Sequence, residues 1–165
     1  MNTDESRLAN LLDPPAGSPG LVRIDPRGIG TEIEDRLGRA QSDLRAAKLM
    51  YDNELYEWTV ACSYYAMYHA VLAGLAQVGL RARTHHAAAT AFEILFTRRS
   101  KLSSEFARQF RKAKQLERRY VEELNNVRQA REEAQYGLGR PVDEGAERVM
   151  TQAHGFVQAI EEVLA

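Results

Sequence analysis

The sequence predicts an all-α protein: an antiparallel four-helix up-and-down bundle with an extra short helix and an irregular N-terminal arm. Apolar residues recur every three or four positions along most of the chain, which is the period of a helix with one buried face. No segment alternates apolar and polar residues as a half-buried strand does. The 165 residues, 44% hydrophobic and 27% charged, have the size and average composition of one globular domain.

The N-terminal arm comprises residues 1–30, and the helical domain comprises residues 31–165. The arm holds four of the five prolines and four of the eleven glycines of the chain, a composition that cannot sustain a long helix. Leu8, Leu11 and Leu12 are spaced to form one short amphipathic turn before the first proline. We expect the arm to be docked rather than loose.

The first long helix is predicted to begin at Thr31 and to run to about Asn53. Thr31 and Glu34 are three positions apart, and in such a capping box each side chain satisfies the other's free backbone amide.

The second helix is predicted from about Leu55 to Val78, closed by Gly79, whose missing Cβ suits a left-handed cap. Its region 58–80 carries no Asp, Glu, Lys or Arg over 23 residues, which is long enough to cross a bilayer. Polar groups such as Thr59 are scattered around it, so the sequence favours a buried helix of the bundle over a membrane span.

Three further helices follow. Thr84 is expected to cap a short third helix, and residues 98–102 are interpreted as a loop. Ser103 or Ser104 then caps a long fourth helix, and Asp143 caps the fifth. The apolar stripe of the fourth helix is Phe106, Phe110, Ala113, Leu116, Tyr120, Leu124, Val127, Ala134 and Leu138. The apolar stripe of the fifth is Ala146, Val149, Met150, Ala153, Phe156, Val157, Ile160, Val163 and Leu164.

We expect a cytoplasmic location from the number of cysteines and from the N-terminal sequence. Cys62 is the single cysteine, so no intramolecular disulfide can form, and no charged region followed by an apolar stretch opens the chain. Neither a HExxH motif nor paired CxxC motifs, a glycine-rich phosphate loop or a Rossmann fingerprint occurs. We therefore expect no metal, no cofactor and no classical nucleotide-fold enzyme.

The net charge of −1 hides a basic segment. Residues 81–119 carry eleven Lys and Arg against three Glu, a net charge of +8, so the remainder of the chain carries −9. If such a segment gathers on one face, it attracts phosphate backbones or an acidic protein surface; otherwise it is a solvated helix face. The candidate phosphate- or nucleic-acid-binding residues are Arg81, Arg83, His85, Arg108, Arg111, Lys112, Arg118 and Arg119.

The adjacent histidines 85 and 86 and the tyrosines of the second helix each allow two interpretations. His85 and His86 open the third helix beside Arg81 and Arg83, where they can hold a phosphate; alternatively one caps the helix and the other is solvated. The tyrosines of the second helix are more typical of a core with hydrogen-bonded tips than of a platform for bases.

Arg131 is the irregular position of the fourth helix. The helical period that joins Val127 to Ala134 places Arg131 on the apolar stripe, where a guanidinium is costly unless it is paired or opens into a wet cleft. Two interpretations are open: Arg131 is a phosphate clamp, or it extends to the edge of the stripe.

Three stretches in this order resemble the HEPN superfamily (higher eukaryote and prokaryote nucleotide-binding), specifically its small stand-alone helical branch. Residues 63–70 read Ser-Tyr-Tyr-Ala-Met-Tyr-His-Ala, similar to that branch's Tyr-Tyr-Ala-Met-Phe-His signature. Thr84-His85 matches a Thr-His pair that opens its third helix. Residues 131–137 read Arg-Glu-Glu-Ala-Gln-Tyr-Gly, similar to Arg-x-x-Ala-Asp-Tyr-Gly.

The resemblance covers about residues 40–165 and implies a four-helix bundle paired through its long helices into a homodimer. It also implies nucleotidyltransferase-family partner proteins and toxin–antitoxin or defence modules. Many HEPN ribonucleases carry Arg-x(4 to 6)-His; here Tyr136 stands at the histidine's spacing from Arg131, and tyrosine is a poor proton shuttle at neutral pH. Gln135 replaces the branch's aspartate, so Arg131 loses a charged partner one helical turn away.

Two hypotheses follow. In the first, the protein is a weakly catalytic or non-catalytic HEPN module that binds a nucleotidyltransferase-type partner, with a basic groove for RNA or DNA. In the second, it is a metal-independent endoribonuclease in which Arg131 contacts phosphate and Tyr136 or a histidine from another helix moves protons. By the same resemblance, Tyr136 could accept a nucleotide from the partner.

Overall fold

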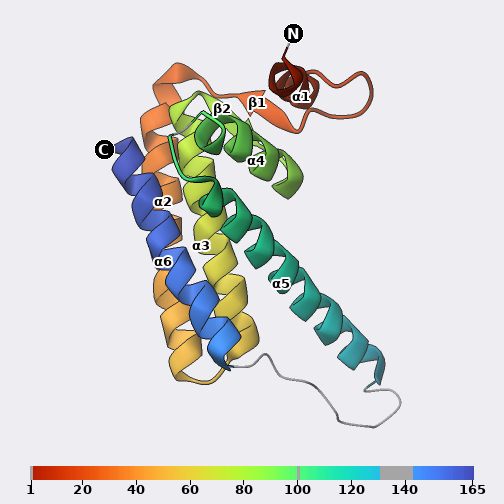
Figure 1. The fold of residues 1–165 in the computed structure, drawn as a ribbon, viewed down its shortest axis with the longest axis vertical. Helices are drawn as coiled ribbons and strands as arrows, with labels where there is room; N and C mark the ends of the chain where they lie inside the picture. Colours follow the sequence, from red (N-terminus) through yellow and green to blue (C-terminus); the bar gives the residue numbers. More distant parts are fainter. Residues whose placement is uncertain (1, 100, 131–142) are drawn as a thin grey trace.

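The computed structural model describes residues 2–99, 101–130 and 143–165; for residues 119–130 and 144 it describes the backbone course (Figure 1). The protein is mostly helical, as predicted. The helices are α1 Thr3–Leu12, α2 Ile29–Asp52, α3 Tyr56–Gln77, α4 His85–Phe92, α5 Ser104–Ala130 and α6 Asp143–Leu164. The shorter elements are the strands β1 Leu21–Arg23 and β2 Leu80–Ala82, the 3-10 turn η1 Pro26–Gly28 and the π-helical turn η2 Glu93–Thr97.

The helix α3 is the centre of the molecule. It lies beside α2 and α6 along most of its length, and it also contacts α4 and α5. Figure 1 shows α2, α3 and α6 side by side, whereas α5 starts against α3 and then diverges from α6 toward its own C-terminal end. The regular four-helix bundle therefore stays a prediction, because α5 follows the other long helices only near its start.

The apolar stripe of α6 is buried, as predicted. Phe156 is fully buried, and its ring lies 5.4 Å from that of Phe92 and 5.9 Å from that of Phe110, measured between centroids. Phe106 completes the cluster at 5.7 Å. These aromatic rings join α4, α5 and α6 into one core.

The sequence-based start of the first long helix was wrong. The helix α2 begins at Ile29, its N-cap is Gly28, and no side chain caps it, so Thr31 lies inside the helix. The reason is local: Asp25 caps the turn η1, which has Pro26 at its start and leads directly into α2. The chain is already helical when it reaches Thr31, so Thr31 is not the residue that precedes the first turn of α2. The predicted capping box therefore does not form the start of this helix.

Other predicted caps are confirmed. Gly79 has φ of +75°, the left-handed conformation expected after a helix. The Thr84 hydroxyl accepts a hydrogen bond from the Ala87 amide at 3.0 Å at the start of α4. The Ser103 hydroxyl accepts one from the Glu105 amide at 3.2 Å at the start of α5.

The arm is more regular than predicted. Asn2 and Glu5 form a capping box for α1, so this helix spans 10 residues before the first proline. The strand β1 pairs with β2 in antiparallel register, Leu21 opposite Ala82. Three-residue strands are too short to show an alternating pattern, which is why the sequence did not predict them. Together these elements dock the arm beside α4 (Figure 1).

Most of the uncharged region 58–80, which is long enough to cross a bilayer, forms the helix α3. This helix buries residues on all of its sides within the core, including Thr59 and Ser63, whose hydroxyls donate to the backbone carbonyls of Leu55 and Thr59. Within residues 2–99, 101–130 and 143–165, the structure holds no helical segment with the length and apolarity of a transmembrane span.

Candidate functional site

The two residues predicted to be catalytic, Arg131 and Tyr136, lie outside the described residues, as does Gln135. The side chain of Arg119 is also outside them. The site is therefore built from the other predicted residues and from those that the fold brings beside them.

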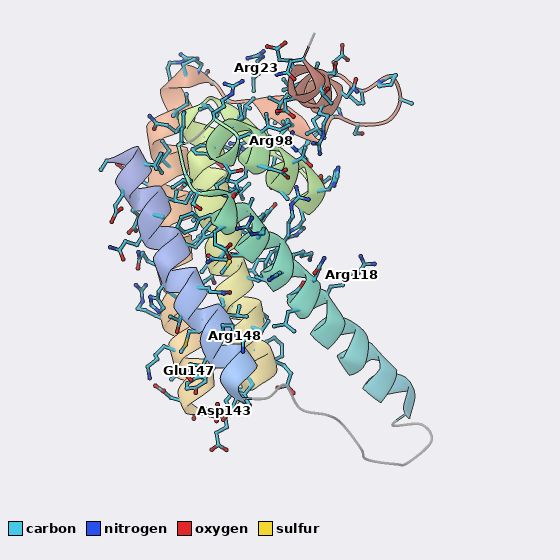
Figure 2. The ribbon with its side chains drawn as sticks, in the orientation of Figure 1. Arg23, Arg98, Arg118, Asp143, Glu147 and Arg148 are labelled. Atoms are coloured by element: carbon cyan, nitrogen blue, oxygen red, sulfur yellow. The ribbon has the colours of Figure 1, made fainter. Side chains whose placement is uncertain are left out.

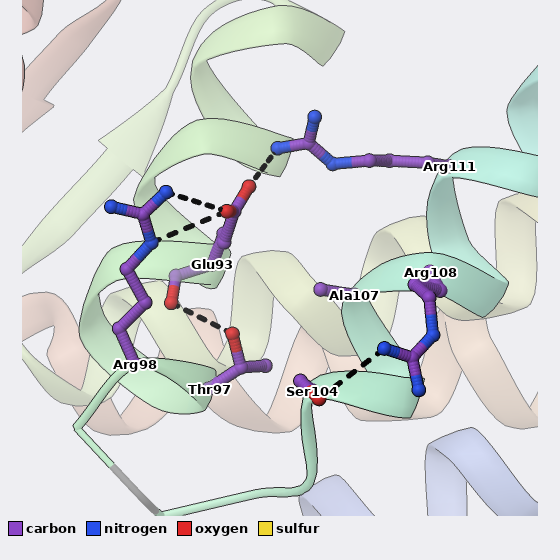
Figure 3. A pocket seen from close by; sticks show the side chains of 7 residues that line it. All are labelled: Glu93, Thr97, Arg98, Ser104, Ala107, Arg108 and Arg111. Carbon is purple, nitrogen blue, oxygen red and sulfur yellow. Dashed lines mark hydrogen bonds and ion pairs between the residues drawn. The ribbon is translucent and has the colours of Figure 1, made fainter.

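A pocket opens where the chain turns from α4 into α5. Its volume is about 410 Å³, and its lining residues are Glu93, Thr97, Arg98, Ser104, Ala107, Arg108 and Arg111. The turn η2 supplies Glu93 and Thr97, and the start of α5 supplies the residues from Ser104 on (Figure 3). The connection between the two elements is short, so the end of one and the start of the next face each other.

Glu93 lies between two of the three arginines of this pocket (Figure 3). Its carboxylate accepts hydrogen bonds from Arg98 Nη2 at 2.9 Å and Nε at 3.3 Å, and it forms an ion pair with Arg111. The hydrogen bonds that Arg98 donates to Glu93 raise the pKa of Arg98 further above its ordinary value. One carboxylate thus holds two guanidinium groups in place, and a second carboxylate, that of Asp4, also pairs with Arg98.

The third guanidinium belongs to Arg108. It donates to Glu105 Oε2 at 3.0 Å through Nε, and Nη1 lies 3.5 Å from Ser104 Oγ. A guanidinium has more N–H donors than these contacts use, so each of the pocket arginines retains donors for oxygen atoms of a ligand. The other two guanidinium groups of the pocket both point to Glu93, whereas Arg108 points toward Ser104 (Figure 3). Guanidinium groups that line one pocket are suited to phosphate groups, because each presents several donors in one plane.

The other predicted basic residues are not gathered at this pocket. Arg81 forms an ion pair with Glu32 of α2 at 2.8 Å, and this hydrogen bond is the main reason that the pKa of Glu32 lies below its ordinary value. Arg83 and Lys112 are exposed. Arg118 is exposed and projects from α5 on the side away from α6 (Figure 2).

Sequence reasoning named Arg108 and Arg111 but missed Arg98 and Glu93 as site residues. Arg98 lies in the segment 98–102 that was predicted to be a loop, and the sequence analysis gave Glu93 no role. The two residues are five positions apart across a helix end, so the helical period does not indicate that they pair. The structure also connects Arg98 to the arm: Arg98 Nη1 forms an ion pair with Asp4 Oδ1 of α1 at 2.5 Å.

A second cluster surrounds His85 at the start of α4. Its Nδ1 is hydrogen-bonded to the Tyr64 hydroxyl, and the Tyr68 ring stacks on its ring at a centroid distance of 4.3 Å. Tyr64 is fully buried, whereas Tyr65 is 39% exposed, so the prediction of a tyrosine core holds for Tyr64 and fails for Tyr65. His86 is exposed. The cap is supplied by Thr84, so the expectation that a histidine caps this helix was wrong.

Lys114 and Glu117 of α5 complete the cluster. Lys114 Nζ lies 5.0 Å from the centroid of the Tyr64 ring and 3.0 Å from Glu117 Oε2. Glu117 is 7% exposed, and its charge is compensated by this ion pair. Burial, followed by the positive charge of Lys114, lowers the pKa of His85, which favours the neutral imidazole.

Metal ligands are not grouped in the part of the chain that the structure describes: no three His, Cys, Asp or Glu side chains there lie close enough together to hold an ion.

Comparison with known proteins identifies the family. The HEPN domain matches residues 33–163, most of the helical part of the chain. The chain belongs to the HEPN family. A protein of Methanocaldococcus jannaschii named "Putative toxin MJ0605" is 28% identical over 138 residues, which cover 84% of this chain and 92% of that protein. A protein of Gloeobacter violaceus named "UPF0332 protein glr0978" is 31% identical over 85 residues, 52% of this chain and 68% of that protein.

The HEPN match contains both clusters and leaves out the whole arm. The arginine pocket and the His85 cluster lie inside residues 33–163, whereas α1 and β1 lie before them. The ion pair between Asp4 and Arg98 therefore connects a segment outside the HEPN match to a pocket inside it.

Proposed function

We propose that this HEPN protein is a toxin-type interaction module of a toxin–antitoxin or defence system, and that it binds RNA or DNA through the basic side of α5. The observation that carries the proposal is the pocket lined by Arg98, Arg108 and Arg111 within the HEPN-matched region. The name of the M. jannaschii relative, a toxin, supports the same class. Membership of the family alone gives no substrate.

The binding part of this proposal is tested with a fluorescent single-stranded RNA and a DNA of the same sequence, titrated at several salt concentrations. If the protein binds phosphates, the logarithm of the binding constant should fall linearly with the logarithm of the salt concentration, because binding releases counterions from the nucleic acid. Arg98→Gln, Arg108→Gln and Arg111→Gln should each weaken binding by about three- to tenfold and reduce the salt slope by about 1.

The matched control is Arg148→Gln, which removes the same charge from an exposed position of α6 at the opposite end of the molecule (Figure 2). It should change the affinity by less than about twofold. Equal losses for the control and the pocket variants would mean that net charge, not the pocket, determines binding. Absence of binding at low salt would contradict the nucleic-acid part of the proposal.

The same incubation separates the module from a metal-independent endoribonuclease. RNA that is bound and remains intact in the presence of a chelator supports the module. RNA cleavage that persists in chelator and disappears in Arg131→Ala supports the alternative enzyme, with Arg131 and Tyr136 or a histidine in the roles assigned above.

The proposal includes the assembly that the family resemblance implies. We expect a cytoplasmic homodimer that pairs through the long helices, and a nucleotidyltransferase-family protein as partner. Light scattering on the purified protein tests the dimer, and co-expression with the product of a neighbouring nucleotidyltransferase gene tests the partner. A monomer at high concentration that co-purifies with nothing would contradict this part.

A further inference from the structure

The hydrogen bond between Tyr64 and His85 determines which nitrogen of the imidazole carries its proton. The Tyr64 side chain is fully buried, so its hydroxyl proton has no water to bind. Burial holds the pKa of this phenol far above its ordinary value, so the phenol keeps its proton. Among the described residues, His85 Nδ1 is the hydrogen-bond partner of that hydroxyl, so the hydroxyl donates and Nδ1 accepts.

An imidazole that accepts at Nδ1 and is neutral carries its hydrogen on Nε2. The two nitrogens lie on different edges of the ring, so the Nε2–H group points away from Tyr64. His85 thus offers one hydrogen-bond donor and no free lone pair. Such a ring is suited to hold an oxygen atom of a ligand, and it is not suited to take a proton from one.

The surroundings of His85 match the chemistry of a nucleotide. Lys114 supplies a positive charge from α5, and its side chain is 37% exposed. Tyr65, 39% exposed, lies 6.3 Å from the His85 ring between centroids, at an interplanar angle of 73°, so the two rings are not stacked on each other. Exposed aromatic rings beside cationic groups are the usual contacts of single-stranded nucleic acid: bases stack on the rings, and phosphates approach the cations.

We propose that His85 and Tyr65 form a contact site for single-stranded RNA, in which His85 Nε2–H donates to a phosphate oxygen and Tyr65 stacks on the adjacent base. This inference rests on the proposed nucleic-acid binding and adds a second contact, on the α3–α4 side, to the arginine pocket. Tyr64 is a positioning residue: it does not touch the RNA, and it holds the His85 ring in the donor form.

The first test uses the unmodified protein. Long-range ¹H–¹⁵N spectra of histidine-labelled protein distinguish the two neutral imidazole forms, and we expect His85 in the Nε2–H form at pH 7.5. Addition of a single-stranded oligouridylate should shift the His85 Nε2–H signal more than the signals of His86 and His154. An Nδ1–H form, or an unshifted signal with RNA bound, would overturn the inference.

The second test compares variants by fluorescence anisotropy with the same oligouridylate. His85→Ala should weaken binding by about ten- to a hundredfold, as expected for the loss of one hydrogen bond to a charged group, and His85→Gln, which retains an N–H donor, should recover part of it. Tyr65→Leu should weaken binding by a similar factor. The matched control is His86→Ala, the exposed neighbour, which should change binding by less than about twofold.

Tyr64→Phe is the most specific variant, because it keeps the ring and removes only the hydroxyl that orients His85. It should produce a mixture of both imidazole forms in the ¹H–¹⁵N spectra together with weaker binding. If His85→Ala and Tyr65→Leu bind like the unmodified protein while Arg111→Gln binds weakly, this inference fails and the proposed function stands. If the unmodified protein binds no RNA or DNA, the proposed function fails.

Discussion

Glu93 determines how the basic segment presents its charge. The sequence shows a net charge of +8 over residues 81–119, but in the structure much of this charge is paired. Glu93 holds both Arg98 and Arg111. From outside the segment, Asp4 also pairs with Arg98, and Glu32 holds Arg81. These ion pairs hold the guanidinium groups in fixed orientations, so the segment does not present its charge as an evenly positive surface. Orientation favours recognition of a phosphate group, whereas a diffuse charge only attracts it.

His69 is the residue whose protonation should affect stability most. Its Nδ1 is buried and has no hydrogen-bond partner among the described residues, and its Nε2 lies 3.8 Å from Asp43 Oδ2. Burial first, and then the charges of Arg36 and Arg39, lowers its pKa to about 4 from the ordinary 6.5. The unfolded chain therefore binds a proton at pH values where the folded protein does not.

We predict that the free energy of unfolding falls as the pH falls from 7 toward 4. Between these values the unfolded state holds more protons at His69, so stability rises with pH; the loss from pH 7.5 to 5.5 should be roughly 1 kcal/mol. Asp43 acts in the opposite direction at lower pH, because burial raises its pKa. Urea unfolding at the two pH values measures the effect.

His69→Gln should remove most of this pH dependence, because glutamine does not titrate. The control is His154→Gln on α6, where the side chain is exposed, and it should leave the pH dependence as it is. An unchanged slope in His69→Gln would show that another group is responsible.

At the scale of the elements, the aromatic cluster at the centre of α4, α5 and α6 holds three helices together. Phe156 lies within 6 Å of the rings of Phe92, Phe106 and Phe110 and is fully buried. Phe156→Ala should lower the free energy of unfolding by about 3 to 5 kcal/mol, since it removes a large buried ring and leaves a cavity. Urea denaturation measures it. Gln158→Ala, two positions on and exposed, should cost less than about 0.5 kcal/mol.

The helix α6 and the first half of α5 were predictable because each has a buried stripe with a helical period, and Phe110 and Ala113 are buried as expected. The helix α3, which is buried on all of its sides, was predictable as a long stretch without charged residues that is closed by Gly79. The strand β1 was not predicted, because it exists where β2 lies opposite it and has no local pattern of its own. The start of α2 was predicted at Thr31 instead of Ile29, although its signal is local: Asp25 and Pro26 begin the turn η1, which leads directly into α2.

The candidate site was predictable in part for the same reason. Arg108 and Arg111 were recognised because they recur along one side of a helix. The role of Tyr64 in orienting His85 depends on a contact between residues 21 positions apart, and the pairing of Glu93 with Arg111 spans 18 positions. A sequence without aligned relatives contains no signal for such pairs, because they depend on how the helices pack.

At the scale of the whole molecule, the arm packs against the same core as the helices of the HEPN-matched region. Leu8, Leu11 and Leu12 of α1 pack against the main core, and Leu21 of β1 belongs to it. Backbone hydrogen bonds continue the attachment beyond the strand pair: the Arg83 amide donates to the Gly20 carbonyl at 2.8 Å, and the Ile24 amide donates to the Gly79 carbonyl at 2.9 Å. The arm therefore closes over the end of α3 and the start of α4.

If the arm and the helices unfold as one unit, a change in the arm must destabilise helices far from it. Leu21 has no exposed surface, so Leu21→Ala should lower the free energy of unfolding by about 2 to 5 kcal/mol. The fluorescence of the single tryptophan, Trp58, reports on the opposite end of α3, and its transition should shift by the same amount as the loss of helical circular dichroism. Arg23→Ala, on the exposed end of the same strand, should shift neither transition by more than about 0.5 kcal/mol. A Leu21→Ala protein whose tryptophan transition is unchanged, but whose first 25 or so residues are removed rapidly by protease, would show instead that the arm opens independently of the helical core.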